Sequence, residues 1–264
     1  MKPVQDLPAR VRRRFREEAA KRIRTHTARA GNPRAMISFT FDDVPVSAAT
    51  EGAAVLDRYG ARGTFYVAGA LCGTRGEDYP HLSAEGCLAL DGAGHEIACH
   101  TFSHRHVADA SAAELADEIA RNAGFFERLG GIRLTNFSYP FGSVSLARKR
   151  QLGSVFASCR STMSGLNGPA LDLGYLRAVV LWHGISRDAV QHWIDRAVRE
   201  NAWLIFVAHD IAADHAPWGC TPEHFRDVVR RAAASSAEIL TVRDALAFAG
   251  IGEPAARASA AVPV

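Results

Sequence analysis

The chain runs Ile37-Ser38-Phe39-Thr40-Phe41-Asp42-Asp43-Val44-Pro45, an apolar segment that ends in two adjacent carboxylates and a proline. Residues 35–41 are mostly apolar or β-branched, which predicts a short buried strand. Pro45 ends that strand because it cannot donate to a β-ladder. Side chains alternate along a strand, so both carboxylates can serve one site only where the strand turns into a loop. Asp42 and Asp43 therefore either cap a following helix or begin a site at the carboxyl end of a strand.

The composition is that of an ordinary globular protein of 264 residues, with 48% hydrophobic and 22% charged residues. No apolar run approaches the roughly 20 residues that span a bilayer, and the first residues lack the apolar core of a secretory signal. The five cysteines have no CxxC spacing, which excludes a thiolate zinc site and argues against a disulfide framework. We therefore expect a cytoplasmic location.

Positive charge is concentrated at the N-terminus. Residues 1–34 hold eleven Lys/Arg against three Asp/Glu, although the whole chain has a net charge of only +3. Residues 8–29 repeat apolar side chains every four positions, which predicts a basic helix with one narrow apolar stripe. We expect its arginines to face solvent, with peripheral contact to an anionic membrane or a polyanion as the alternative. The remainder of the chain is mildly acidic, so no nucleic-acid partner is expected.

Apolar strand-like runs alternate with helical patterns along most of the chain. Strands are expected at 63–67, 95–99, 134–139, 154–157, 177–181, 203–208 and 239–242, and helices at 47–59, 83–91, 111–129, 186–200, 222–234 and 243–249. This order predicts an α/β fold, a single-domain (β/α) barrel that is distorted or incomplete, with seven to eight strands. A doubly wound open sheet is the alternative, although no G-x-G-x-x-G signature is present. The expected parts are a helical extension at 1–34, the barrel at 35–250 and a flexible tail at 251–264.

Two histidines follow the strand at 95–99. His100 and His104 lie four residues apart, so both imidazoles share a face if the segment turns helically. One carboxylate from Asp42 or Asp43 would complete a two-histidine, one-carboxylate site with open positions. Such a set suits zinc in hydrolysis or ferrous iron in oxygen chemistry.

Two further strand ends carry polar groups. His209 follows the apolar strand 203–208, where it either acts as a general acid or base or caps the following helix. Tyr139-Pro140-Phe141-Gly142 follows the strand at 134–139. Proline and glycine fix a tight loop there, and its free backbone N–H groups could form an oxyanion hole.

Four segments in this order resemble the NodB-homology polysaccharide deacetylases, carbohydrate esterase family 4. The resemblance extends over roughly residues 35–245. It is carried by Thr40-Phe41-Asp42-Asp43, His100-Thr101-Phe102-Ser103-His104, Ser138-Tyr139-Pro140-Phe141-Gly142 and Ile205-Phe206-Val207-Ala208-His209.

The resemblance implies a role for each matched residue. Asp42 would be the general base and His209 the general acid, and a divalent metal would be held by Asp43, His100 and His104. Zinc is the expected metal, with cobalt, nickel and manganese as alternatives. Substrate and oxyanion contacts would come from Tyr139, Pro140, Phe141, Ile205 and Val207, the last two lining the pocket for the acetyl methyl group.

The sequence departs from the family pattern at three places. Ser138 stands where many members have an arginine that pairs with the base, Val44 replaces the usual glycine after the aspartates, and no D-x-x-D-W motif is found. We expect Arg177, just before an apolar run, to supply the missing cation near Asp42.

These observations predict a metal-dependent hydrolase. Its expected substrate is an N-acetyl group, less favourably an O-acetyl group, on an amino sugar, oligosaccharide or polysaccharide precursor. The alternatives are a hydrolase of a non-sugar amide, a ferrous oxygenase, and a carbohydrate- or metal-binding protein without turnover. The pair of Asp42 and His209 favours hydrolysis, because an oxygenase needs no such acid and base.

Overall fold

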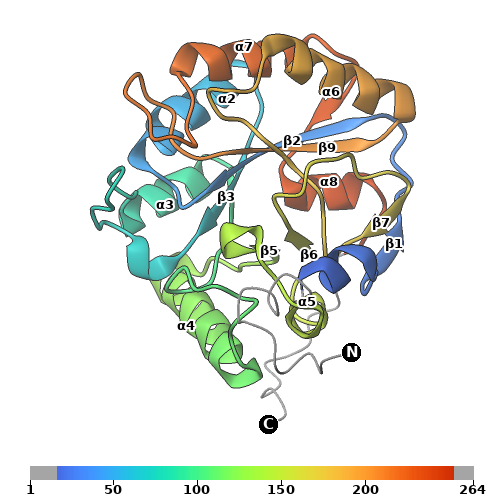
Figure 1. Cartoon of the computed structure of the whole chain (residues 1–264). Coiled ribbons are helices and arrows are strands. Elements are labelled where there is room, and N and C mark those ends of the chain that lie inside the picture. Colours follow the sequence, from blue (N-terminus) through green and yellow to red (C-terminus); the bar gives the residue numbers. More distant parts are fainter. Residues whose placement is uncertain (1–16, 253–264) are drawn as a thin grey trace, which may run out of the picture.

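A parallel sheet curls into an irregular barrel with helices around its outside (Figure 1). The computed structural model describes residues 17–252. The barrel strands follow the order β6-β5-β4-β3-β2-β9-β8, and β10 pairs with β2 beside that path. The predicted distorted (β/α) barrel is thus confirmed, and the doubly wound alternative is excluded.

The strands are short, and they pair in parallel with one another. Their bounds are β2 Met36–Asp42, β3 Thr64–Val67, β4 Glu96–Cys99, β5 Asn136–Ser138, β6 Ser158–Arg160, β8 Val179–Val180, β9 Trp203–Ala208 and β10 Glu238–Ile239. Residues 173–176 join the two outermost strands. Leu176 donates to Cys159 O at 2.9 Å and accepts from Ser161 N at 2.8 Å, and the chain then continues into β8.

Helices cover the outer face of the sheet (Figure 1). Their bounds are α2 Ala54–Arg58, preceded by a π-helical turn Ala48–Ala53, α3 Ala84–Gly92, α4 Ala112–Gly130, α5 Leu146–Gly153, α6 Arg187–Glu200, α7 Pro222–Ala233 and α8 Val242–Phe248. The start of α4 has a capping box, in which Ser111 and Glu114 each accept from the other's backbone N–H. Gly131 ends α4 with φ 72°, a left-handed conformation that glycine adopts without strain.

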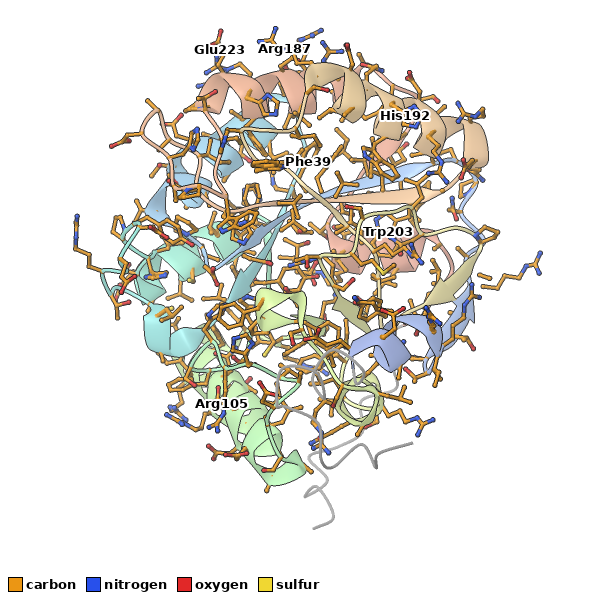
Figure 2. All side chains as sticks on the ribbon, in the orientation of Figure 1. Phe39, Arg105, Arg187, His192, Trp203 and Glu223 are labelled. Carbon is orange, nitrogen blue, oxygen red and sulfur yellow. The ribbon has the colours of Figure 1, made fainter. Side chains whose placement is uncertain are left out.

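Alternation along each strand separates the outer core from the barrel interior. On β2, Ile37, Phe39 and Phe41 face outward and pack under the helices, where Phe39 stacks on the Phe206 ring at 5.5 Å. Figure 2 shows Phe39 and Trp203 inside the molecule, and Arg105, Arg187, His192 and Glu223 at its surface. The intervening β2 residues, Asp42 among them, face inward. Asp42 therefore points into the barrel at its carboxyl end.

One predicted strand is wrong. Residues 154–157 do not form a strand. They follow α5, and the strand β6 begins at Ser158. The apolar pattern was misleading here, because Val155 lies half exposed in the turn after α5. The real strand buries only Cys159 on its outer side and directs polar Ser158 and Arg160 inward.

The N-terminal helix also ends earlier than predicted. Helical structure ends by residue 22, and Thr27–Arg29 form strand β1, antiparallel to β7 Ala170–Asp172. Buried Lys149 donates to the carbonyls of Ala20 and Ile23, both at 2.7 Å, and so fixes the end of this helix to the barrel.

Most of the N-terminal arginines and the tail at 253–264 lie outside the described residues. The expected solvent or lipid contact of the basic segment therefore stays a prediction. Within residues 17–252, no helix has the length and apolar character that crossing a membrane requires.

Candidate active site

The predicted polar residues meet at one rim of the barrel. Parallel strands place their carboxyl ends together, and β2, β4, β5, β6 and β9 each contribute an inward or rim-facing polar group there. Asp42 lies within electrostatic reach of His100, His209 and Arg160. Side chains more than 100 residues apart in sequence thus form one cluster.

Asp43, His100 and His104 form the one group among the described residues whose ligand atoms converge as a metal site requires, all within 4.8 Å of one another. Asp43 Oδ1 lies 3.4 Å from His100 Nε2 and 3.0 Å from His104 Nε2. Atoms around a tetrahedral ion with bonds of ~2.0–2.1 Å are about 3.3 Å apart, so the spacing fits zinc-like coordination.

Hydrogen bonding of His100 supports the same conclusion. Its Nδ1 lies 2.9 Å from Ser138 O, which can only accept, so Nδ1 carries a proton. In the neutral ring, Nε2 then directs a lone pair at Asp43 Oδ1, a buried atom without a hydrogen-bond donor. Two acceptors face each other, and a cation is required between them. Protons on the imidazoles or one divalent metal ion can meet that need, and metal binding would release those protons.

The loop that carries the two histidines is not helical, unlike the geometry considered from the sequence. Thr101 and His104 have φ of 62° and 55°. Glu118 on α4 stabilises the loop by accepting from the backbone N–H groups of Phe102 at 2.9 Å and Ser103 at 2.8 Å. Glu118 was missed in the sequence, where it is one of several polar residues on an amphipathic helix.

Asp42 is paired with a buried cation. Arg160 Nη2 donates to Asp42 Oδ1 and to Ser138 Oγ, and Ser138 Oγ lies 3.3 Å from the same carboxylate oxygen. Burial alone would raise the pKa of Asp42, but the guanidinium, with His100 and His209, lowers it below the ordinary value. Arg160 also lies over the Tyr66 ring, 4.8 Å from its centroid. Asp42 is thereby kept ionised and fixed in place.

The expectation that Arg177 supplies this cation is therefore corrected. Ser138 and Arg160 are register partners on neighbouring strands β5 and β6, so their side chains lie on the same inner face. The guanidinium therefore reaches Asp42 from β6, one strand beyond the β5 position at which the family pattern has its arginine. Arg177 instead packs over Gly165, where an added Cβ would lie 2.7 Å from Arg177 Cδ.

His209 follows β9 at the same rim, on the inner face that it shares with Ile205 and Val207. Its Nδ1 is buried and has no hydrogen-bond partner in the described part of the chain. Burial lowers the pKa of His209, and the nearby carboxylates of Asp42 and Asp43 offset this only in part. An unpartnered imidazole nitrogen beside two carboxylates is suited to exchange a proton with a substrate.

The proline loop has one buried aromatic side chain, Tyr139, and one exposed aromatic side chain, Phe141. Tyr139 was expected to bind substrate, but its side chain is buried in the outer core and its hydroxyl donates to Gly174 O at 2.7 Å. Phe141 has φ 59° and an exposed ring, whose centroid lies 4.5 Å from that of His104 and 3.9 Å from that of His106. Phe141 therefore forms one wall of the site, beside the histidine cluster.

Tyr79 is a further residue that the sequence did not indicate. Its hydroxyl donates to Asp43 Oδ2 at 3.4 Å, on the side of the carboxylate away from the histidines. Burial, together with the Asp43 charge, raises the pKa of Tyr79, so the hydroxyl keeps its proton. It lies in the long loop after β3, and no local pattern connects it to Asp43.

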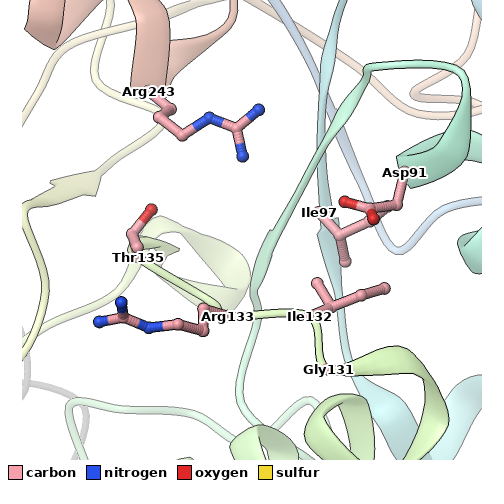
Figure 3. A pocket seen from close by; sticks show the side chains of 7 residues that line it. All are labelled: Asp91, Ile97, Gly131, Ile132, Arg133, Thr135 and Arg243. Atoms are coloured by element: carbon pink, nitrogen blue, oxygen red, sulfur yellow. The ribbon is translucent and has the colours of Figure 1, made fainter.

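A separate pocket of about 250 Å³ lies at the opposite end of the barrel (Figure 3). It opens beside the amino ends of β4 and β5 and the start of α8, with Arg133, Thr135 and Arg243 on one side and Asp91 on the other. None of the catalytic candidates lines it, so this pocket is not the site.

The sequence profile of the polysaccharide deacetylase family matches residues 29–154. That range, just under half of the chain, is similar to a polysaccharide deacetylase domain. The resemblance read from the four motifs is confirmed. The matched range includes Asp42, Asp43, His100, His104 and the proline loop.

Other proteins are similar to this chain in sequence or in fold. A bifunctional xylanase/deacetylase from Pseudobutyrivibrio xylanivorans is 24% identical over 111 residues, which are 42% of this chain and only 17% of that protein. A Mycobacterium smegmatis protein assigned to the polysaccharide deacetylases has a TM-score of 0.64 at 15% identity, covering 92% of this chain and 100% of its own. A family 4 acetyl xylan esterase from Clostridium thermocellum, in complex with a cobalt ion, has a TM-score of 0.58 at 18% identity, covering 82% and 93%. These two structures show the shared fold.

Proposed function

We propose that this deacetylase domain is a metal-dependent hydrolase that removes an N-acetyl group from an amino sugar within an oligosaccharide or polysaccharide. One observation carries the proposal: a carboxylate kept ionised by a buried arginine lies next to the Asp43, His100 and His104 cluster, with an unpartnered imidazole at the same rim. Amide hydrolysis needs a base for water, a polarised carbonyl and a proton for nitrogen, and this rim offers all three.

Asp43, His100 and His104 would hold the metal ion, most suitably zinc given two imidazoles and one carboxylate. When bound, the ion would polarise the acetyl carbonyl and acidify water. Tyr79 supports this set by donating to the outer oxygen of Asp43. Partners outside a ligand set typically orient the ligands, and we assign that role to Tyr79.

The proton transfers are assigned to Asp42 and His209. Asp42 takes a proton from a water molecule while the oxygen of that water forms a bond to the acetyl carbon. The carbon–nitrogen bond then breaks, and protonated His209 gives its proton to the leaving amine, so the products are acetate and a free amino sugar. The backbone N–H of Phe141 would stabilise the developing oxyanion, and Ile205 and Val207 would contact the methyl group. Because burial lowers the pKa of His209, activity should favour a slightly acidic pH.

Acetate release tests this proposal. Metal-reconstituted protein is incubated with N-acetylglucosamine oligomers and, as a second arm, with acetylated xylan, because an O-acetyl ester could react at the same site. We expect acetate chiefly from the first arm, and none from either arm with Asp42→Asn protein. Release of acetate from acetylated xylan alone would mean that the substrate is an O-acetyl ester and not an N-acetyl amide. The absence of acetate in both arms, with bound metal measured, would overturn the proposal.

A further inference from the structure

Two tryptophans are exposed on neighbouring loops of the barrel. Trp182 is 37% exposed and Trp218 is 64% exposed, and their ring centroids are 6.3 Å apart at an angle of 49°. Tryptophan is costly to leave in water, and adjacent exposed rings commonly mark a binding surface. Among the other residues that the structure describes, and apart from Phe141 at the site, exposed large apolar side chains are scattered singly: Ile23, Tyr59 and Val155.

Both rings stand on the catalytic rim. Trp182 follows β8, whose continuation Leu181 donates to Val207 O on β9 at 2.7 Å. Trp218 lies in the loop that starts at His209 and Asp210, and the two loops are joined by a bond of 2.8 Å from His183 N to Gly219 O. The tryptophans therefore lie on the His209 side of the barrel opening, across from the Phe141 wall on β5.

The loop that carries Trp218 is held in a defined conformation. Asp210, the neighbour of His209, accepts from Ser47 Oγ and from Ala216 N, the latter at 3.0 Å. Ser47 Oγ also accepts from Ile211 N at 3.0 Å, which ties this loop to the segment after Asp42 and Asp43. Space around the rings is equally tight: a Cβ at Gly184 would lie 2.4 Å from the Trp182 ring. The rings are thus presented on a fixed support.

Polar groups border the aromatic surface. The imidazoles of His183 and His215 stack with centroids 5.4 Å apart, one from each loop, and the His183 ring lies 5.0 Å from that of Trp182. A pyranose ring has the matching chemistry, because its C–H groups form apolar faces and its hydroxyls lie around the edge. Indole faces would contact the C–H groups, and imidazole nitrogens would exchange hydrogen bonds with hydroxyls.

We propose that Trp182 and Trp218, with His183 and His215, form a carbohydrate-binding platform for the sugar units next to the one that is deacetylated. This inference deepens the proposed function, on which it rests, because it assigns the residues that bind the neighbouring units of the sugar chain. The platform lies beside His209, so it holds the chain on the side of the leaving amine.

The charge of the platform favours a neutral glycan over the other occupants of such a surface. Residues 181–185 and 210–220 contain no lysine or arginine and two aspartates, so an anionic lipid surface has no complementary charge there. A protein interface usually buries about 800 Å² on each partner, far more than two indole rings present. Two indoles with an imidazole border match the size of one or two sugar rings.

Binding of N-acetylglucosamine oligomers of one to six units tests the platform. The measurement uses full-length Asp42→Asn protein, which binds without turnover, and follows tryptophan fluorescence and calorimetric heat. We expect affinity to rise with chain length. Adding Trp218→Ala or Trp182→Ala should weaken hexamer binding about 3- to 10-fold, the scale of one lost aromatic contact, and should flatten the dependence on length.

Control variants keep the result specific. Trp218→Phe retains a flat ring and should lose less affinity than Trp218→Ala, whereas exposed Tyr59→Ala, on the helical side, should bind as the parent does. Equal affinity for all lengths, or tryptophan variants that bind hexamer like the parent, would overturn the platform. So would self-association that buries Trp218 without any glycan binding. If glycans bind through the tryptophans and the unsubstituted enzyme releases no acetate, the platform stands and the hydrolase proposal fails.

Discussion

The barrel buries a carboxyl group at each end of its interior, and the two groups differ in the charge of their partners and in the direction of their pKa shifts. At the amino end, Glu96 accepts from Asn136 Nδ2 at 2.6 Å, Thr64 Oγ1 at 2.9 Å and Arg243 N at 2.9 Å. Its partners are neutral groups, and burial raises its pKa. At the carboxyl end, Asp42 pairs with a guanidinium, which together with nearby histidines lowers its pKa.

The difference separates a carboxyl group held by neutral hydrogen-bond donors from the one to which we assign the role of general base. Glu96 connects β3, β4 and β5 to the start of α8, and hydrogen bonds take up both of its oxygens. Asp42 has a cation on one side and unpartnered imidazole and carboxylate atoms on the other. The backbone differs too: of the six non-glycine residues with positive φ between positions 17 and 252, five lie in the loops after β2, β4 and β5, namely Asp43, Val44, Thr101, His104 and Phe141. Strain of this kind tends to gather at functional sites.

The largest effect should come from neutralising each carboxyl group in turn. Asp42→Asn should lower the rate of acetate release by about 10²- to 10⁴-fold, the usual contribution of a general base, while metal content is kept. Glu96→Gln, an equally small change at an equally buried site, should leave the rate within a few-fold of the parent. Comparable rate losses in both variants would remove the functional distinction between the two ends.

Loss of the Asp43 carboxylate should weaken metal binding rather than proton transfer. Asp43→Asn is expected to weaken zinc affinity by at least about 100-fold, because even partners outside a ligand set cost 10–100-fold when removed. Competition with a fluorescent chelator measures the affinity. Glu96→Gln is again the control, since it lies at the other end of the barrel. Unchanged zinc affinity in Asp43→Asn would contradict the assigned ligand set.

Exchanging the residues at positions 138 and 160 moves the cation beside Asp42 from one strand to the next. Arg160→Ser leaves Asp42 buried without its partner, which should cost about 3–5 kcal/mol of stability and most of the turnover. The double variant Ser138→Arg, Arg160→Ser places the guanidinium on the register-paired position of β5. Turnover and the urea midpoint should then recover in part. Recovery no better than that of Arg160→Ser alone would show that the cation must come from β6.

The smallest effect should appear in the pH dependence of stability. The pKa of Glu96 is raised in the folded state, so its contribution is fully present below the unfolded pKa of about 4.3 and is lost as pH rises through the folded pKa. The free energy of unfolding of Glu96→Gln, relative to that of the parent, should therefore rise between pH 4 and pH 8. Any effect of the substitution that does not depend on pH adds a constant to this difference. Urea unfolding at several pH values measures this. Parallel profiles of stability against pH for the two proteins would mean that burial does not shift the pKa of Glu96.

The sequence predicted those parts of the molecule in which local pattern and tertiary position agree. The barrel followed from apolar runs that alternate with helical segments, and the cluster of Asp42, Asp43, His100, His104 and His209 followed from polar residues at strand ends. The predicted start of the helix at 111 agrees with α4 because a local capping box, with two bonds that span only three residues, fixes it.

What could not be predicted depends on strands whose apolar signal is weak. Strand β6 has a single outward apolar residue, Cys159, between inward Ser158 and Arg160. The predicted strand was therefore placed on the apolar residues 154–157, and Arg160 was no longer recognisable as a strand-end residue. Glu118 and Tyr79 were missed for another reason, since each supports the site across the fold without any local pattern.

The register between β5 and β6 has a consequence for how such enzymes diverge. Positions 138 and 160 occupy adjacent places on one inner surface although 22 residues separate them in the chain. A cation can therefore pass from one strand to the other by two substitutions, with no change in backbone or in the atom that it contacts. The position of the cation in this part of the fold is then set by a row of neighbouring side chains across the sheet. Relatives that lack the arginine of the proline loop should be searched for a basic residue in that row.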